Sequence, residues 1–114
     1  MMRPKQITAT ASGNLGPIPL DRYVNGYAVA VTMKSPGVIY TLQHSFDDPY
    51  QRWSVSMNTS ATWFNHDDLI MVNGSTNNDS NYAFPPTACR LVVTRAASAA
   101  NPVTLTVVPM GALQ

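Results

Sequence analysis

The stretch Tyr27-Ala28-Val29-Ala30-Val31-Thr32-Met33 decides the fold. Large apolar residues alternate in it with small or polar ones, which is the period of a β-strand with one buried face. The pair Pro36-Gly37 follows, and these two residue types suit the central positions of a type II turn. A second alternating run, Val38–His44, comes directly after the turn. We therefore predict two strands joined as a β-hairpin.

The same period of two continues toward both ends of the chain. Further strands are predicted over Gln6–Ala11, Trp53–Asn58, Leu69–Val72, Cys89–Thr94 and Val103–Val107. Of these, Leu69–Val72 is a continuous apolar run, which is typical of a strand buried on both faces. Glu is absent, and β-branched residues, Asn and Pro are frequent, so helix propensity is low. Outside the strands we expect one helical turn, over Arg95–Ala100.

Many short strands separated by turn residues are typical of sandwiches and barrels. We predict an all-β fold, an antiparallel β-sandwich of jelly-roll type. The length of 114 residues supports one core, so residues 1–114 are expected to form a single domain. Two stretches do not alternate: residues 13–20, predicted to be an irregular Pro/Gly segment, and Asn73–Pro86, predicted to be a long loop.

The charge of the chain is low and balanced. Charged residues make up 11% of it, and the formal net charge is +1. The chain has neither the basic patch that nucleic acid or an anionic membrane would attract nor an apolar run of about 18 residues that could span a bilayer. The start of the chain is too polar for a signal peptide, and a single cysteine cannot form an internal disulfide. We expect a soluble protein that folds in the cytosol.

Two clusters of His and Asp are the features closest to an enzyme site: His44-Ser45-Phe46-Asp47-Asp48 and His66-Asp67-Asp68. Their spacing matches no ligand signature for a metal. Asp residues at the end of a strand also cap the backbone N–H groups of turns, and we prefer that interpretation. Cys89 lies in an alternating strand and is interpreted as a core residue rather than a nucleophile. We predict no enzyme activity, no catalytic residue, no cofactor and no bound metal.

Aromatic and proline residues provide the candidate contact surface. Tyr82 and Phe84, flanked by turn residues, are predicted to be exposed anchors for a protein partner. Trp63 and Phe64 are adjacent, so their side chains should point to opposite faces of an extended segment. Pro17 and Pro19 restrict a segment that could lie across a neighbouring protein at low entropic cost. The predicted interface residues are Tyr82, Phe84, Trp63, Pro17 and Pro19.

Several stretches of the chain resemble small structural proteins of tailed bacteriophage virions. They are Gln6–Gly13, Tyr40–Pro49, Trp63–His66, Asn81–Pro85 and Arg90–Thr94. In size and β-character the chain is similar to the cement, or staple, proteins that decorate phage capsids. The resemblance implies a jelly-roll protein on the outer capsid surface, made in the host cytoplasm. It further implies that the protein bridges major capsid subunits, as a homodimer or other symmetric assembly.

Two other functions fit the same residues. A phage tail adaptor or fibre-associated module would share the virion setting but occur in few copies per particle. A carbohydrate-binding β-sandwich module would use aromatic rings as stacking platforms, and its candidate residues are Tyr50, Trp63, Tyr82 and Phe84.

Overall fold

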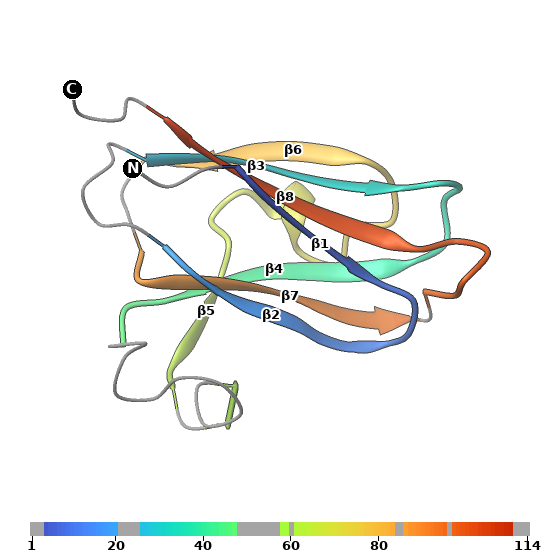
Figure 1. The fold of residues 1–114 in the computed structure, drawn as a ribbon, viewed down its shortest axis with the longest axis horizontal. Coiled ribbons are helices and arrows are strands. Elements are labelled where there is room, and N and C mark those ends of the chain that lie inside the picture. Colours follow the sequence, from blue (N-terminus) through green and yellow to red (C-terminus); the bar gives the residue numbers. More distant parts are fainter. Residues whose placement is uncertain are drawn as a thin grey trace.

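A computed structural model of the chain describes residues 4–20, 26–47, 58–59, 61–83, 86–95 and 97–110. They form two four-stranded antiparallel sheets that lie face to face (Figure 1). The first sheet contains, in spatial order, β1 (Lys5–Ala9), β8 (Val103–Met110), β3 (Gly26–Met33) and β6 (Asn78–Tyr82). The second contains β2 (Gly13–Pro19), β7 (Ala88–Arg95), β4 (Ile39–Ser45) and β5 (Trp63–Asn65). The prediction of an all-β antiparallel sandwich is confirmed.

The core lies between the two sheets and is built from every second residue of the central strands. Val29 and Val31 of β3 and Leu105 of β8 face Leu42 of β4 and Leu91 of β7, and all five are buried. Successive side chains of a strand point to opposite faces, so one apolar face of each sheet closes against the other. The alternating runs that predicted these four strands are confirmed.

The connection between β3 and β4 is not a hairpin. Strand β3 lies in the first sheet and β4 in the second, so Pro36-Gly37 carries the chain from one sheet to the other. Gly37 has a φ of 127°, a conformation that glycine adopts without steric cost. The break between the two strands was predicted correctly, but the pairing of β3 with β4 was wrong. Alternation specifies which face of a strand is buried and not which strand it pairs with.

Residues 13–20 are more regular than predicted. Gly13–Pro19 form strand β2, which pairs with β7, and the register shifts between Leu15 and Ile18. Gly16 has a φ of 109° within that shift, and the Gly16–Pro17 peptide bond is cis. The prediction of an irregular segment was therefore wrong except at this bulge, where an extra residue interrupts the ladder.

The apolar run Leu69–Val72 does not form a strand. Leu69–Met71 form a 3₁₀ turn, η1, whose N-cap Asp68 accepts a hydrogen bond from the Ile70 N–H at 3.3 Å. Met71 is fully buried, whereas 79% of the Leu69 surface is exposed. A 3₁₀ turn points successive side chains in different directions, so it can bury one residue of an apolar run and expose another.

The polar stretch after η1 contains strand β6, where a loop had been predicted. Residues Asn78–Tyr82 pair along their whole length with β3. The segment from Ser98 to Asn101 also differs from expectation, because Ser98 and Asn101 exchange backbone hydrogen bonds in a turn rather than starting a helix. The predicted strand over Trp53–Asn58 lies outside the described residues, apart from Asn58.

Candidate functional site

Aromatic side chains gather at one end of the sandwich, where β4 and β5 meet the end of β6. His44 of β4 is directly opposite Phe64 of β5, and the two rings stack with their centroids 5.9 Å apart. The rings of Phe46 and Tyr82 contact the same imidazole in T-shaped arrangements, with centroid distances of 5.4 and 5.0 Å. The ring centroids of Phe46 and Phe64 are 6.0 Å apart. The four rings form one contiguous aromatic cluster.

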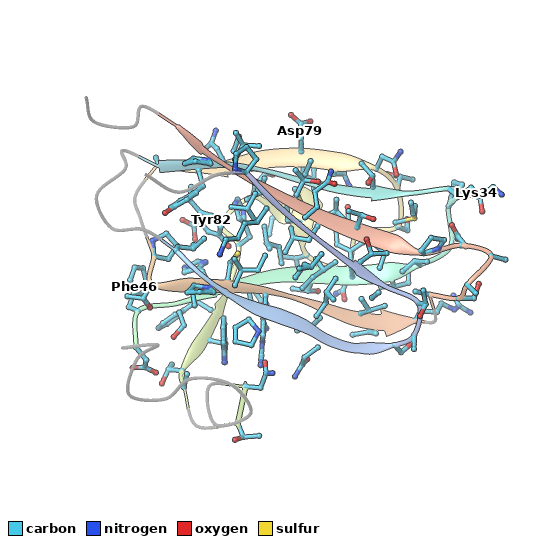
Figure 2. The ribbon with its side chains drawn as sticks, viewed as in Figure 1. Lys34, Phe46, Asp79 and Tyr82 are labelled. Atoms are coloured by element: carbon cyan, nitrogen blue, oxygen red, sulfur yellow. The ribbon has the colours of Figure 1, made fainter. Side chains whose placement is uncertain are left out.

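The cluster has an outer and an inner layer. Phe46 is 54% exposed and Phe64 is 49% exposed, while His44 and Tyr82 are buried. Phe46 stands at the end of the sandwich, and Tyr82 lies between the sheets (Figure 2). The two Phe rings therefore expose apolar surface over a buried aromatic layer.

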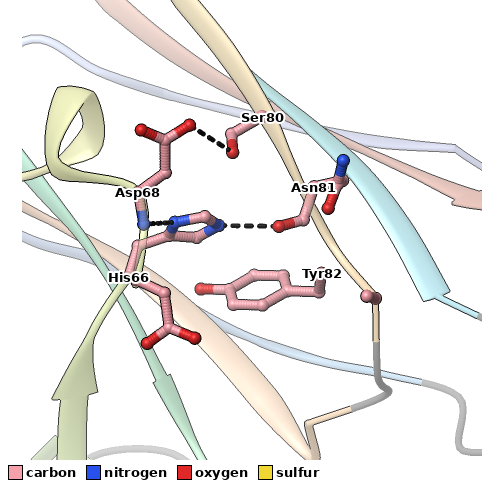
Figure 3. Close-up of a pocket in the computed structure, with 7 residues that line it drawn as sticks. His66, Asp68, Ser80, Asn81 and Tyr82 are labelled. Atoms are coloured by element: carbon pink, nitrogen blue, oxygen red, sulfur yellow. Dashed lines mark hydrogen bonds between the residues drawn. The ribbon is translucent and has the colours of Figure 1, made fainter.

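Tyr82 of this cluster also lines a hollow of about 280 Å³ (Figure 3). Its lining residues are His66, Asp67, Asp68, Ser80, Asn81, Tyr82 and Ala83. Tyr82 belongs to both the hollow and the cluster, since its ring lies 4.7 Å from that of His66 and 5.0 Å from that of His44.

Hydrogen bonds fix the polar wall of the hollow. The Asp68 N–H donates to His66 Nδ1 at 2.9 Å, so the proton of the neutral ring is on Nε2, which donates to the Asn81 carbonyl at 2.8 Å. The hydroxyl of Ser80 donates to the second carboxylate oxygen of Asp68 at 3.0 Å. These bonds connect the start of η1 to β6, and they occupy both nitrogens of His66.

The interpretation of the Asp residues as caps of turns is confirmed at Asp68. Asp68 caps η1, and Asp47 accepts a hydrogen bond from the Thr62 N–H at 2.6 Å. Asp48 lies outside the described residues. Within the described ranges no three His, Cys or Asp side chains are grouped in a way that could hold a metal ion.

Cys89 is a core residue, as predicted. Its side chain is fully buried opposite His44, and burial raises the pKa of the thiol to about 12. A thiol reacts as its thiolate, so this pKa keeps Cys89 unreactive at neutral pH. Burial likewise raises the pKa of the Tyr82 phenol.

The structure corrects one of the predicted interface residues and separates the others. Tyr82 is 2% exposed, because it faces inward from β6 opposite Tyr27, so the prediction that it is an exposed anchor was wrong. Phe84 lies outside the described residues. Pro17 and Pro19 are half-buried in β2, at the far edge of the second sheet from β5.

Trp63 lies on the outer face of the second sheet, while Phe64 lies on the inner face, as predicted for adjacent residues. Trp63 is half-buried, and the Arg90 guanidinium lies over its ring at 4.3 Å from the centroid. Arg90 also donates to Gln43 Oε1 and to Asn58. The face of the Trp63 ring that Arg90 covers is therefore engaged in a cation–π contact within the protein.

Phe46 is an exposed aromatic residue that was not among the predicted interface residues. It continues the inward parity of β4, two residues beyond His44, past the point where the strand ends. The alternation of β4 could have indicated this position. An apolar residue that continues the inward-facing pattern just beyond the end of a strand is expected at the end of the core.

Comparison with models of known protein families, with curated proteins and with solved structures finds no match to this chain. Among the described residues, no helix has the length and apolar character needed to cross a membrane.

The burial of His44 predicts a loss of stability in mild acid. Burial lowers the pKa of His44 from 6.5, with smaller effects from Asp67, which raises it, and His66, which lowers it. In the unfolded chain the His44 imidazole becomes protonated near pH 6.5, whereas in the folded protein it becomes protonated only at a lower pH. The stability contribution is therefore full above pH 6.5 and is lost as the pH falls through the lower folded pKa.

Replacement His44→Phe keeps an aromatic ring and removes the titration. We expect the free energy of unfolding of this variant, measured in urea at pH 7.5, 6.5 and 5.5, to fall less steeply than that of the wild type. Equal slopes for the two proteins would contradict the assignment, since His66 is present in both.

Proposed function

We propose that this chain is a non-enzymatic cement protein of a tailed bacteriophage capsid. In this proposal it sits on the outer surface of the virion and bridges neighbouring major capsid subunits. It would be made in the host cytoplasm and would associate with its own copies in a symmetric arrangement on the shell.

The observation that carries the proposal is the order of strands in the two sheets. The orders are β1-β8-β3-β6 and β2-β7-β4-β5, so, among the described strands, every connection changes sheet except that between β4 and β5. Eight strands arranged as two interlocked four-stranded sheets are what a jelly roll requires. This order supports the jelly-roll form that the resemblance to cement proteins implies.

The outer face of the first sheet gives further support. Its outward positions carry small or uncharged side chains, and Asp79 is the one charged residue among those described. They are Gln6, Thr8, Ala28, Ala30, Thr32, Asp79, Asn81, Thr104, Thr106 and Val108. Side-chain hydrogen bonds connect Thr8 to Thr104 at 2.9 Å and Gln6 to Thr106 at 3.1 Å. Depletion of charge is typical of the buried centre of protein interfaces.

The carbohydrate-binding alternative receives less support from the structure. Tyr82 is buried, and the Arg90 guanidinium covers one face of the Trp63 ring. Tyr50 and Phe84 lie outside the described residues. A sugar platform needs an open ring face. Tyr82 presents none, and one face of the Trp63 ring is occupied by Arg90.

The proposal is tested by heating virions that lack the protein. A cement protein adds contacts between shell subunits, and its many copies act together, so particles without it should release their genome at a lower temperature. Dye access to DNA during a thermal ramp measures that release, and adding the purified protein back should restore the wild-type temperature. An unchanged release temperature would contradict cementing.

Copy number per particle separates the capsid from the tail. A shell protein should be present in proportion to the capsid subunits, whereas a tail adaptor should occur in roughly a dozen copies or fewer, following the symmetry of the tail. Quantitative gel analysis of purified particles measures this ratio.

A further inference from the structure

We propose that the open edge of strand β1 is a self-association surface, and that its occupant is β1 of a second copy of this chain, paired antiparallel about a two-fold axis at Ile7. Two copies of the four-stranded first sheet would then join into one continuous sheet. The proposed function calls for a symmetric arrangement on the shell but assigns no surface to it. The inference goes beyond that function, because it rests on the strand edges alone.

The other three edge strands are each closed to pairing. At β6, His66 Nε2 donates to the Asn81 backbone carbonyl at 2.8 Å, and η1 packs against the same strand. Strand β2 contains Pro17 and Pro19 and a shift of register. Strand β5 has only three residues. Covering loops, prolines, bulges and short strands are the means by which proteins protect sheet edges from pairing.

Strand β1 has none of these protections. Lys5–Ala9 is a strand of five residues without proline, and it pairs with β8 along its whole length without a shift of register. Among the described residues, it has a neighbouring strand on that side only. A strand directs the N–H and C=O groups of alternate residues to either side, so the open side of β1 presents a row of donors and acceptors to another strand.

The length of β1 determines the register. Antiparallel pairing centred on Ile7 places Gln6 opposite Thr8 of the second copy and Lys5 opposite Ala9. Because Ile7 is the middle residue, this register pairs all five residues of the strand, whereas one centred on Gln6 or Thr8 would pair only three of them. The register with the most complete ladder is therefore symmetric about Ile7.

The side chains on both faces of β1 fit this register. On the inner face, Ile7 is half-buried against the core, and Ile7 of the second copy would cover apolar surface that remains exposed. On the outer face, Gln6 would lie beside a threonine, as it already does across β8, where it donates to Thr106 at 3.1 Å. Pairing thus continues the core on one face and the polar ladder on the other.

The charge of β1 selects the antiparallel direction. Lys5 is the one charged residue of the strand. Parallel pairing in register would place the two Lys5 side chains directly opposite each other, which is destabilising. Antiparallel pairing separates them by four residues, or about 14 Å at about 3.4 Å per residue. This exceeds the screening length of about 8 Å at physiological salt, so the two charges oppose this pairing little.

Analytical ultracentrifugation of the purified chain tests the association. A five-residue ladder is a small interface, so we expect monomer at about 10 µM and dimer at about 1 mM. Hydrogen exchange at both concentrations locates the contact: amides within residues 5–9 should exchange more slowly in the dimer, and those of β5 should not change. A chain that stays monomeric at the higher concentration, or a dimer without added protection in β1, would overturn the proposal.

Charge substitutions test the register. The double variant Gln6→Lys, Thr8→Lys would set like charges opposite each other on both sides of the axis, and we expect its dissociation constant to rise about 10-fold. The variant Gln6→Glu, Thr8→Glu should be weakened in the same way. A mixture of the two should recover at least the wild-type affinity, since each ammonium group then faces a carboxylate. No recovery in the mixture would contradict this register.

The matched control is the double variant Thr32→Lys, Asn81→Lys. It adds the same charge to exposed positions of the same outer face, on β3 and β6, away from β1. It should associate like the wild type, and a loss equal to that of Gln6→Lys, Thr8→Lys would contradict an interface at β1. Because Gln6 and Thr8 are exposed, their variants should fold, and thermal unfolding of each variant is recorded alongside.

The two proposals fail in different ways. If the chain dimerises through β1 and virions without it release their genome at an unchanged temperature, the edge pairing stands and cementing is contradicted. If the chain stabilises virions but stays monomeric at about 1 mM, cementing stands and the edge pairing is overturned. Protection of residues 5–9 that appears only on particles would likewise overturn it, because the strand would then pair with a shell protein.

Discussion

Replacement of Leu105 by alanine is expected to lower the free energy of unfolding by about 2–5 kcal/mol, the usual cost of truncating a buried leucine. Leu105 is fully buried in β8, between Ile7 of β1 and Val31 of β3. The rigid ladders on both sides prevent the neighbouring strands from moving into the space that the side chain leaves. Domains have total stabilities of about 5–15 kcal/mol, so this loss would be a large share of the whole. Urea unfolding followed by fluorescence measures it.

The matched control is the same substitution at Leu69. This leucine is 79% exposed on η1, and its truncation should change the free energy of unfolding by no more than about 0.5 kcal/mol. Similar losses for the two variants would contradict the placement of the core between the sheets.

The substitution Gly74→Ala is expected to cost about 2–4 kcal/mol, through overpacking and the loss of two backbone hydrogen bonds. A Cβ at residue 74 would lie 2.7 Å from the Ile70 carbonyl oxygen and 2.7 Å from Cζ of Tyr40. The Tyr40 ring cannot turn aside, because it is fully buried and its hydroxyl donates to the Thr76 carbonyl and accepts from Asn78. Gly74 and Tyr40 also exchange backbone hydrogen bonds at 2.9 and 3.0 Å, which the new methyl group would break.

The control for Gly74→Ala is Ser75→Ala, at the next residue, whose side chain is exposed. Denaturant unfolding should separate the two variants by at least about 1.5 kcal/mol. Hydrogen exchange gives a second readout. The Tyr40 amide should exchange faster than in the wild type in the Gly74→Ala variant and at the wild-type rate in the control. Wild-type stability and exchange in both variants would mean that the close packing around Gly74 is wrong.

The sequence was sufficient to predict the central strands, because those strands have one face in the core and one outside it. Strands β3, β4, β7 and β8 must place an apolar residue at every second position, and this leaves a pattern that no other local structure imitates. The sandwich class followed from the number of such runs and the turn residues between them. The partner strands did not follow: β3 was predicted to pair with β4 but pairs with β6 and β8, because alternation carries no information about the partner strand.

The polar edge of the first sheet could not be predicted from periodicity. Of the three inward positions of β6, only Tyr82 enters the core, while Asn78 and Ser80 bond to η1 and its cap. An edge strand that is covered by a loop has no need of apolar residues at those positions. Its sequence, Asn-Asp-Ser-Asn-Tyr, therefore reads as a loop.

The candidate site was predicted only in part, because it too depends on tertiary packing. The aromatic residues of the relevant stretches were singled out, but Tyr82 was assigned to the surface because turn residues surround it. Phe46 and Phe64 replace it as exposed rings, and the hollow depends on contacts between residues 66–68 and 80–83. Those contacts arise from the way η1 covers β6, which depends on tertiary packing and leaves no pattern in the sequence.

The alternation of the chain between the two sheets also constrains how the molecule can reach its native state. Strand β1 has no neighbour to pair with until β8 is in place, and the Gln6–Thr106 bond joins residues 100 positions apart. Among the described strands, β4 and β5 alone are both consecutive and paired. Folds with such distant pairings have a high contact order and form in milliseconds to seconds rather than microseconds. A ribosome that is still synthesising β7 would therefore hold a chain whose first strand is unpaired, and folding must be completed after β8 has emerged.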